Sequence, residues 1–336
     1  MLSFRVTPGT VRSTVARQLV ICGLLLGLIG GGLSAEGFAQ GTKKKRDLQP
    51  PRNETLLTRD NVNIHITYFK SSMGSESPVI ILLHMKDGNR FVWQNGFAER
   101  LQAAGYAVIT VDLRGHGESK GGFAGVPAAN KKGGKKGGRS VESTELRPAD
   151  YVNMVAEDLE AVKKFIFDEH QAENLNMNKI GIVGPEMGAS IAAYFALDDW
   201  YKRPYPDGQI GYRTPRGQDV RALVLASPQN NVPGLPISKP LTDLRNPQWG
   251  VAFLVCVGKK DTQDRGLAKK LYTQLTAFPK SEERMYFEEY NSKLRGTELL
   301  GKNLRFEEHM LAFFDKTLKG LPDNWRDRRS KLDRKE

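Results

Sequence analysis

Short apolar runs alternate along the chain with longer segments in which apolar residues recur every three or four positions. The runs have the length of strands, and most of them are continuous, which is typical of parallel strands covered on both faces. Strands are therefore expected at 78–84, 107–112, 179–184, 220–227, 251–258 and 284–290. This alternation predicts an α/β fold with a mostly parallel central sheet and helices on both faces.

Other patterns place a hairpin and the helices. Residues 54–69 alternate between polar and apolar positions around Asp60–Asn61, which predicts two strands joined by a turn. A helix is expected to follow the strand at 179–184, and the helix that begins near Trp93 is expected to end at Gly105. The helical stripes are Trp93, Phe97 and Leu101; Val152, Val155, Leu159, Val162 and Ile166; Leu267, Leu271 and Leu275; and Met310, Phe313, Phe314 and Thr317.

Two segments interrupt this rhythm. Residues 119–147 include KKGGKKGG, which has no apolar side chain to pack on a core, so we expect a flexible Gly/Lys-rich loop. Residues 200–219 are rich in Tyr, Pro, Gly and Arg and predict an irregular insertion. The pattern as a whole predicts one domain over 54–320, followed by a charged tail at 321–336.

The N-terminus has the order of an export signal. Arg5, Arg12 and Arg17 precede the apolar run 19–33, and small residues follow it. We expect residues 1–39 to form a signal peptide, cleaved after Ala35 or Ala39, with 40–53 as a basic linker. An uncleaved membrane anchor is the alternative, but the run is short and rich in glycine for a spanning helix. The expected location is periplasmic or secreted, without an integral membrane span after cleavage.

The charge of the chain bears on the partners that it could bind. The 336 residues carry a formal net charge of +12, and the basic residues cluster at 43–46, 131–139 and 326–335. Such runs are typical of solvated segments, and the run Lys131–Arg139 could also bind an anionic polymer or surface.

Signal cleavage would leave Cys256 as the single cysteine, which excludes an internal disulfide. Cys256 lies in an apolar strand and is expected to be a small buried hydrophobe.

The stretch 183–190, VGPEMGAS, carries the candidate chemistry. Gly184 and Gly188 frame three residues between a predicted strand and a predicted helix, which is the setting of a nucleophile elbow. The middle residue of such an elbow is usually Ser, but here it is Glu186. At an elbow, Glu186 would adopt a sparsely populated backbone conformation that costs about 1–3 kcal/mol.

Four segments in the same order make the chain resemble the α/β-hydrolase superfamily over roughly 54–320. They are VIILLHMKDGNRFVW (79–93), VDLRGHGES (111–119), the elbow segment and FLVCVGKKD (253–261). The resemblance implies that Asp261 is the triad acid. It also implies that the backbone N–H groups of Met85 and Met187 form the oxyanion hole, although His-Gly is more usual than His84-Met85.

A fifth segment departs from the family. RGTELL (295–300) places Arg295 where many members carry the catalytic histidine. The resemblance therefore implies a degenerate triad of Glu186, Asp261 and Arg295. Arginine cannot be a general base, because its pKa lies far above any working pH. Relatives with an acidic nucleophile use Asp at the elbow, and they still need a histidine to activate water.

Other residues fit the missing roles poorly. His309 is the only histidine after the last strand, and its place at the edge of a helical stripe favours a half-buried structural residue. Ser190 lies one turn into the helix after the elbow. Ser227 ends a strand without framing glycines.

The three triad-equivalent residues could form a carboxylate–guanidinium–carboxylate chain, because the planar fork of Arg295 can serve two acids. We expect the Glu186 carboxylate to occupy the oxyanion hole as a built-in anion. The alternative is that Glu186 and Arg295 point into water and never meet.

The sequence thus favours an exported protein, non-catalytic or weakly catalytic, that binds a small molecule or a protein partner through the cleft of a hydrolase fold. One alternative is an ester or amide hydrolase that uses a non-standard residue such as His309. A second alternative is a protein held to an anionic surface by its Lys-rich segments. No cofactor and no metal site are expected.

Overall fold

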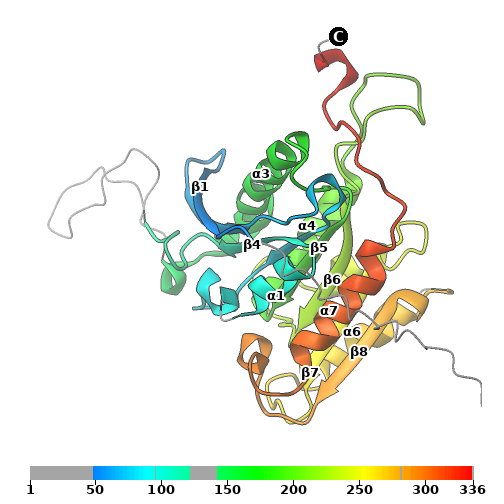
Figure 1. Cartoon of the computed structure of the whole chain (residues 1–336). Coiled ribbons are helices and arrows are strands. Elements are labelled where there is room, and N and C mark those ends of the chain that lie inside the picture. The colour runs from blue at the N-terminus through cyan, green and yellow to red at the C-terminus, as the bar shows by residue number, and fades with distance from the viewer. Residues whose placement is uncertain (1–47, 95, 122–141, 281, 335–336) are drawn as a thin grey trace, which may run out of the picture. The chain divides into compact units, whose positions relative to one another are not determined.

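A computed structural model describes residues 48–94, 96–121, 142–280 and 282–334 (Figure 1). Its centre is an eight-stranded sheet in the order β1-β2-β4-β3-β5-β6-β7-β8. Strand β2 is antiparallel to β1 and to β4, and all the other neighbours are parallel, so the predicted mostly parallel sheet is confirmed. The strands are β1 (Arg52–Leu57), β2 (Asn63–Phe69), β3 (Val79–Leu82), β4 (Ala107–Asp112), β5 (Ile180–Pro185), β6 (Val220–Ala226), β7 (Ala252–Gly258) and β8 (Met285–Tyr290).

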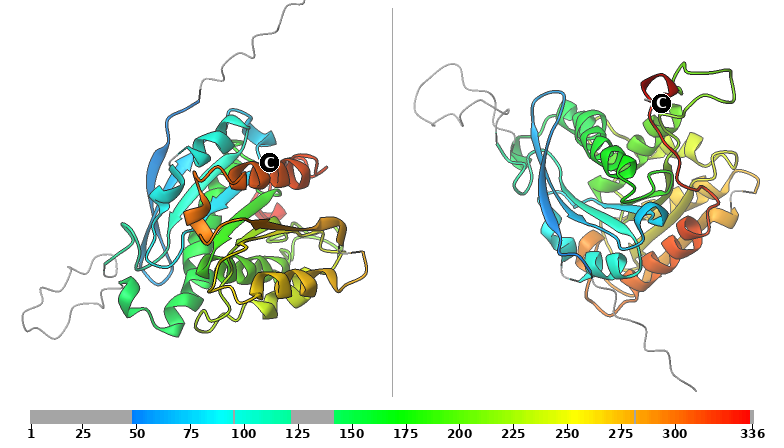
Figure 2. Two further views of the ribbon diagram at one scale, coloured as in Figure 1. Left: turned by 90° about the horizontal axis from the view of Figure 1, so that it is seen from below. Right: turned by 45° about the horizontal axis from the view of Figure 1, so that its top comes forward.

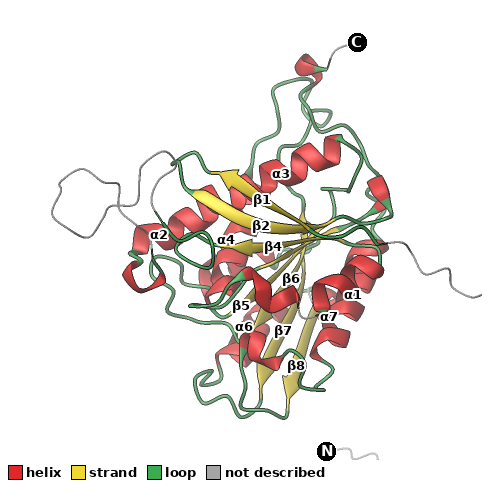
Figure 3. Cartoon of the chain, turned by 60° about the vertical axis from the view of Figure 1, so that its left-hand side comes forward, coloured by secondary structure: helices red, strands yellow, loops and turns green. Residues whose placement is uncertain are grey.

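Helices cover both faces of this sheet. Helices α1 and α7 lie on one side of it, and α3 and α4 lie on the other (Figure 3). Seen from below, α7 in red-orange and α6 in gold also lie on opposite sides of the strands (Figure 2, left). The α-helices are α1 (Phe97–Ala103), α2 (Pro148–Asn153), α3 (Leu159–Gln171), α4 (Met187–Tyr201), α5 (Ser238–Leu244), α6 (Leu267–Thr276) and α7 (Phe306–Phe314).

Short helical turns accompany these elements. Two are π-helical, at Met154–Asp158 between α2 and α3 and at Asp315–Lys319 after α7. The 3₁₀ turns are Gly74–Glu76, Arg90–Gln94, Ser143–Glu145, Glu282–Arg284, Gly296–Leu299 and Lys331–Asp333.

Two apolar cores follow from the pleat of the strands, because successive side chains point to opposite faces. In β3, Val79 and Ile81 pack with residues of α3 and α4, whereas Ile80 and Leu82 pack with residues of α1 and α7. All four side chains are fully buried. The continuous apolar runs of the sequence thus correspond to strands with no solvent-facing side.

The helix expected from Trp93 to Gly105 is wrong in its first half. Residues 90–94 form a 3₁₀ turn, and α1 begins only at Phe97. Gly96 lies between them with φ of 103°, a left-handed conformation that breaks a right-handed helix. Trp93 is held separately, because its indole N–H donates to the carbonyl oxygen of Leu83 at 2.7 Å.

The structure describes the predicted insertion at 200–219 but only the ends of the predicted loop at 119–147. Between α4 and β6, residues 202–219 form turns and bends without a helix or strand. Most of the predicted loop 119–147 lies outside the described residues, including the basic run 131–139, and so does the predicted signal peptide 1–39. Strand β1 begins at Arg52, two residues inside the predicted linker. None of the helices in the described ranges is long and apolar enough to cross a membrane.

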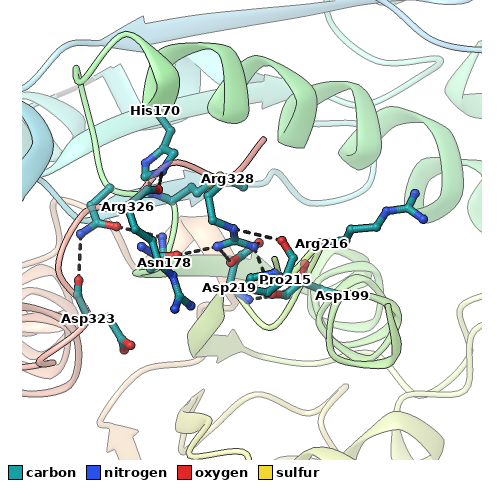
Figure 4. A network of polar contacts seen from close by, with 12 residues as sticks. His170, Asn178, Asp199, Pro215, Arg216, Asp219, Asp323, Arg326 and Arg328 are labelled. Atoms are coloured by element: carbon teal, nitrogen blue, oxygen red, sulfur yellow. Dashed lines mark hydrogen bonds and ion pairs between the residues drawn. The ribbon is translucent and has the colours of Figure 1, made fainter. Parts of the chain in front are cut away.

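The interpretation of residues 321–336 as a charged tail needs correction. The described part of this segment packs back onto the domain near the carboxyl end of α3 (Figure 4). The indole of Trp325 donates to the carbonyl oxygen of His170 at 2.7 Å, and the His170 ring donates from Nε2 to the carbonyl oxygen of Arg326 at 2.8 Å. Arg328 is only 2% exposed.

A buried network of charges holds this basic segment. Arg328 contacts Asp219 and Asn178, and its Nη2 donates to the carbonyl oxygen of Gly217 at 3.2 Å. Lys163 approaches the same Asp219 carboxylate at 2.8 Å and also contacts Asp199. These two cations keep the pKa of Asp219 below its ordinary value although burial opposes ionisation.

Candidate functional site

The elbow predicted at 184–188 is formed by the sharp connection between β5 and α4. Glu186 occupies its tip with φ of 48° and ψ of −113°, the sparsely populated conformation expected for this position. Its N–H donates to the carbonyl oxygen of Ala226 at 2.9 Å, and its own carbonyl oxygen accepts from the N–H of Ala189 at 3.1 Å. Hydrogen bonds to β6 and α4 therefore hold the strained residue in place.

Each framing glycine has a steric reason. A Cβ atom on Gly184 would lie 2.3 Å from the carbonyl oxygen of Gly188, which is backbone and cannot move aside. On Gly188, a Cβ atom would lie 3.2 Å from the carbonyl oxygen of His84 and 3.3 Å from the Cβ of Leu83. Because Gly184 and Gly188 have no side chains, β5, α4 and the loop after β3 can approach one another this closely.

The loops after β7 and β8 bring Asp261 and Arg295 to the same end of the sheet. Nε of Arg295 lies 2.6 Å from Oε1 of Glu186 and 3.7 Å from Oδ2 of Asp261. The N–H at Nε is not directed at an acceptor, so these contacts are ion pairs and not aligned hydrogen bonds. Nη1 of Arg295 donates to the side-chain oxygen of Gln263. The three sequence-predicted residues thus lie together, in the order carboxylate, guanidinium, carboxylate.

Burial shapes the charges at this site. Glu186 and Arg295 are each 8% exposed. Burial raises the pKa of Glu186 above its ordinary value, Arg295 opposes this rise, and the nearby acids Glu298, Asp261 and Asp87 add to it. One guanidinium therefore balances more than one carboxylate, and ionised Glu186 depends on Arg295 for compensation.

The prediction that the Glu186 carboxylate fills the oxyanion hole does not match the structure. Within the described residues, neither the N–H of Met85 nor that of Met187 donates to this carboxylate, which turns toward Arg295 instead. The positive charge of Arg295 attracts the Glu186 carboxylate and accounts for this orientation. The side chain of Met85 leans the same way, and its sulfur accepts from the N–H of Thr297 at 3.4 Å, next to the loop that carries Arg295.

Two contacts at the site were not foreseen. Gln263 holds the guanidinium of Arg295, and the hydroxyl of Ser227 accepts from the N–H of Gly296 at 3.0 Å. Ser227 has φ of 47° and is fully buried at the carboxyl end of β6. Its position at the end of a parallel strand was the available signal, since such ends converge on one edge of the sheet.

The other candidate residues have structural partners. His309 is half-buried on α7, with Nδ1 at 3.3 Å from the hydroxyl of Tyr290 and at 3.4 Å from the Glu288 carboxylate. Ser190 is buried in α4, and its hydroxyl donates to the carbonyl oxygen of Gln229 at 3.4 Å. Cys256 is fully buried in β7, and burial raises the pKa of its thiol.

Two buried histidines lie behind the loops of the site. Nε2 of His84 accepts from the N–H of Leu113 at 3.1 Å, and Nδ1 donates to the carbonyl oxygen of Met85 at 2.7 Å. Its ring lies 4.6 Å from that of His116. Burial and the neighbouring imidazole lower the pKa of His84 to about 3. His84 is thus a neutral structural residue with both ring nitrogens engaged.

A pocket of about 780 Å³ opens beside Arg295, between the loops after β6 and β7. It is predominantly polar, because nine of its twelve lining residues have polar side chains. In the part of the chain that the structure describes, no group of three or more His, Cys, Asp or Glu side chains could hold a metal ion. The site thus combines the ion-paired side chains of Glu186, Arg295 and Asp261 with an adjacent polar pocket that has room for a ligand.

Comparison with known proteins gives one short stretch of sequence similarity. No protein-family model matches the chain. Over 97 residues, 27% of its length, it is 30% identical to protein phosphatase methylesterase 1 of Bos taurus and of Mus musculus. The aligned stretch spans 26% and 25% of those two relatives, about a quarter of each.

Similarity to solved structures extends over most of the chain. An acylaminoacyl peptidase of Pyrococcus horikoshii matches with a TM-score of 0.53 and 14% identity, covering 84% of this chain and 44% of that one. An esterase of Pyrococcus furiosus matches with a TM-score of 0.51 and 13% identity over 80% of this chain and 92% of that one. An esterase of Rhizomucor miehei matches with a TM-score of 0.51 and 12% identity, covering 82% of this chain and 84% of that one. At these identities, the similarity concerns the fold alone.

Proposed function

We propose that this chain, which has the α/β-hydrolase fold, binds a ligand at the carboxyl end of its sheet and does not hydrolyse it. The observation that carries this proposal is the 2.6 Å contact between Nε of Arg295 and Oε1 of Glu186, with Asp261 beside the same guanidinium. These residues occupy the elbow and the loop positions at which hydrolysis would need a nucleophile and a base.

The chemistry of the three side chains supports a non-catalytic site. A guanidinium donates hydrogen bonds and has no acceptor, so Arg295 cannot take a proton from a nucleophile or a water molecule. Attack by the Glu186 carboxylate on an alkyl carbon would displace the leaving group and form an ester intermediate, and breakdown of that ester would need water activated by a base. Among the described residues, no histidine forms a hydrogen bond or an ion pair with Glu186, Asp261 or Arg295. A covalent cycle that began at Glu186 would stop at the ester.

The alternative of a hydrolase based on His309 has less support. That imidazole contacts Tyr290 and Glu288, so its neighbours are β8 and α7 instead of the elbow. In the described part of the chain, no hydrogen bond or ion pair links it to Glu186 or Asp261. The ion-paired site is therefore the better basis for a function.

Turnover of 4-nitrophenyl acetate by purified protein tests the proposal. We expect wild-type protein and Glu186→Ser to remain at the background rate, because neither has a base. Glu186→Ser combined with Arg295→His restores both roles and should exceed either single variant by at least about tenfold, since general-base catalysis contributes about 10²–10⁴-fold in evolved sites. Glu186→Ser with Arg295→Gln is the matched control without a base. Wild-type turnover that Glu186→Ala abolishes would overturn the proposal.

We further propose that the protein is exported. The support is the order of positive charge, apolar run and small residues in 1–39, which lies outside the described residues. N-terminal sequencing of the protein from its native cell should begin near residue 36 or 40. Recovery of Met1 would contradict export by cleavage.

A further inference from the structure

We propose that the pocket beside Arg295 binds a small anion that carries hydroxyl groups, namely a sugar acid or a sugar phosphate. This inference rests on the proposed function and adds the chemical class of the ligand. The pocket has a volume of about 780 Å³, which lies in the range of small-molecule sites. Its composition then decides which small molecules it suits.

Two cations at the pocket have no partner that neutralises them. Arg265 and Lys270 both line the pocket and are exposed, and neither forms an ion pair within the described residues. Arg295 also lines the pocket, but Glu186 and Asp261 offset its charge from behind. The attraction for an anion therefore comes mainly from Arg265 and Lys270.

The only carboxylate among the lining residues is already engaged. Oδ1 of Asp264 accepts from the N–H of Ala268 at 2.9 Å, and the carbonyl oxygen of Asp264 accepts from the N–H of Leu267 at 2.9 Å. Both donors belong to the first turn of α6, whose positive end partly offsets this charge. The remaining field of the pocket favours an anion.

Amide side chains supply the second part of the specificity. Gln229, Asn230 and Asn231 line the pocket from the loop after β6, and Gln263 lines it from the loop after β7. An amide both donates and accepts hydrogen bonds, as a hydroxyl group does, so a row of amides suits a polyhydroxylated molecule. Pro228 and Leu267 are the main apolar groups in the lining, which leaves little surface for an acyl chain.

Isothermal titration calorimetry with four probes tests the ligand class. D-Glucuronate and D-glucose 6-phosphate are the two anionic sugars, D-glucose is the neutral control, and hexanoate is the acid without hydroxyl groups. We expect at least one anionic sugar to bind at least about tenfold more tightly than glucose and hexanoate, because glucose lacks the charge that attracts the cations and hexanoate lacks the hydroxyl groups that bind the amides. The stronger of the two identifies the acid group. Equal binding of glucose, tighter binding of hexanoate, or no binding of either sugar anion would overturn the inference.

Charge-removing variants locate the site. Arg265→Gln with Lys270→Gln should weaken binding of the preferred sugar anion by at least about fivefold, given the exposure of both side chains. Lys269→Gln is the control, because Lys269 lies on α6 and is exposed but lines a neighbouring pocket. An equal loss with Lys269→Gln would overturn the assignment of this pocket.

The ester assay keeps the two proposals separate. An inactive wild-type protein that binds neither sugar anion contradicts the ligand class alone. Ester turnover that depends on Glu186 contradicts the proposed function, whatever the binding data show.

Discussion

Glu186 combines two unfavourable features, a backbone with φ of 48° and a charged side chain that is only 11% exposed. Its backbone is held by hydrogen bonds to Ala226 and Ala189, and its charge is compensated by Arg295 at 2.6 Å. The resemblance to the α/β-hydrolase superfamily was enough to predict that Glu186, Asp261 and Arg295 lie together. The direction of the Glu186 carboxylate could not be predicted, because it depends on the balance between backbone N–H groups and a guanidinium from a distant loop.

The pH dependence of stability reports on this balance. Burial raises the pKa of Glu186 above its ordinary value of 4.5, so the folded state holds this proton more tightly than the unfolded state. The stability due to this group is fully present below pH 4.5 and is lost as pH rises through the folded pKa.

Urea unfolding of wild-type protein and Glu186→Gln at pH 4.5 and pH 7 measures this effect, because the variant lacks the titrating group. We expect the free energy of unfolding of wild type minus that of the variant to decrease between these two pH values. An increase would mean that Arg295 outweighs burial and lowers the pKa.

At the scale of elements, the site is made by four parallel strands whose carboxyl ends converge. The elbow follows β5, Ser227 follows β6, Asp261 follows β7 and Arg295 follows β8. The strands and their faces could be predicted, since a continuous apolar run of this length is typical of a parallel strand buried on both sides. The break before α1 could not, because Trp93 continues the helical spacing while Gly96 and the indole hydrogen bond to Leu83 end it.

The tight contact between β5 and α4 makes Gly184 the most sensitive position of the elbow. Gly184→Ala would place a Cβ atom 2.3 Å from the carbonyl oxygen of Gly188 and should lower the free energy of unfolding by about 3 kcal/mol. Gly320→Ala is the control, because no atom lies within 4 Å of its added Cβ and its φ is −76°. Urea unfolding should show a change within about 0.5 kcal/mol for the control. Equal effects would contradict the steric account.

On the scale of the whole molecule, the C-terminal segment is joined to the domain by a buried charge network and not by apolar packing alone. Arg328 lies between Asn178 and Asp219 (Figure 4). Lys163 connects Asp219 to Asp199. The sequence could not distinguish this segment from a solvated tail. A basic run has the same composition in both cases, and Asp219, the acidic partner of Arg328, lies 109 residues away along the chain.

Removal of Arg328 should therefore destabilise the domain. Arg328→Gln leaves Asp219 buried with Lys163 as its remaining cation, and we expect a loss of about 3 kcal/mol in the free energy of unfolding. Arg329→Gln is the control, because Arg329 has a side chain that is 53% exposed and pairs locally with Asp327. Its effect should stay within about 1 kcal/mol. A similar small effect for Arg328→Gln would show that the segment is not held by this network.

The central claim is that Glu186 and Arg295 form an ion pair at the positions where hydrolysis would need a nucleophile and a base. A double-mutant cycle on these two residues tests it most directly. The free energies of unfolding of wild type, Glu186→Gln, Arg295→Gln and the double variant are measured at pH 7. Because both residues are 8% exposed and their charged atoms are 2.6 Å apart, we expect a favourable coupling of about 1–2 kcal/mol. Effects that add within about 0.3 kcal/mol would contradict the ion pair and, with it, the account of the site.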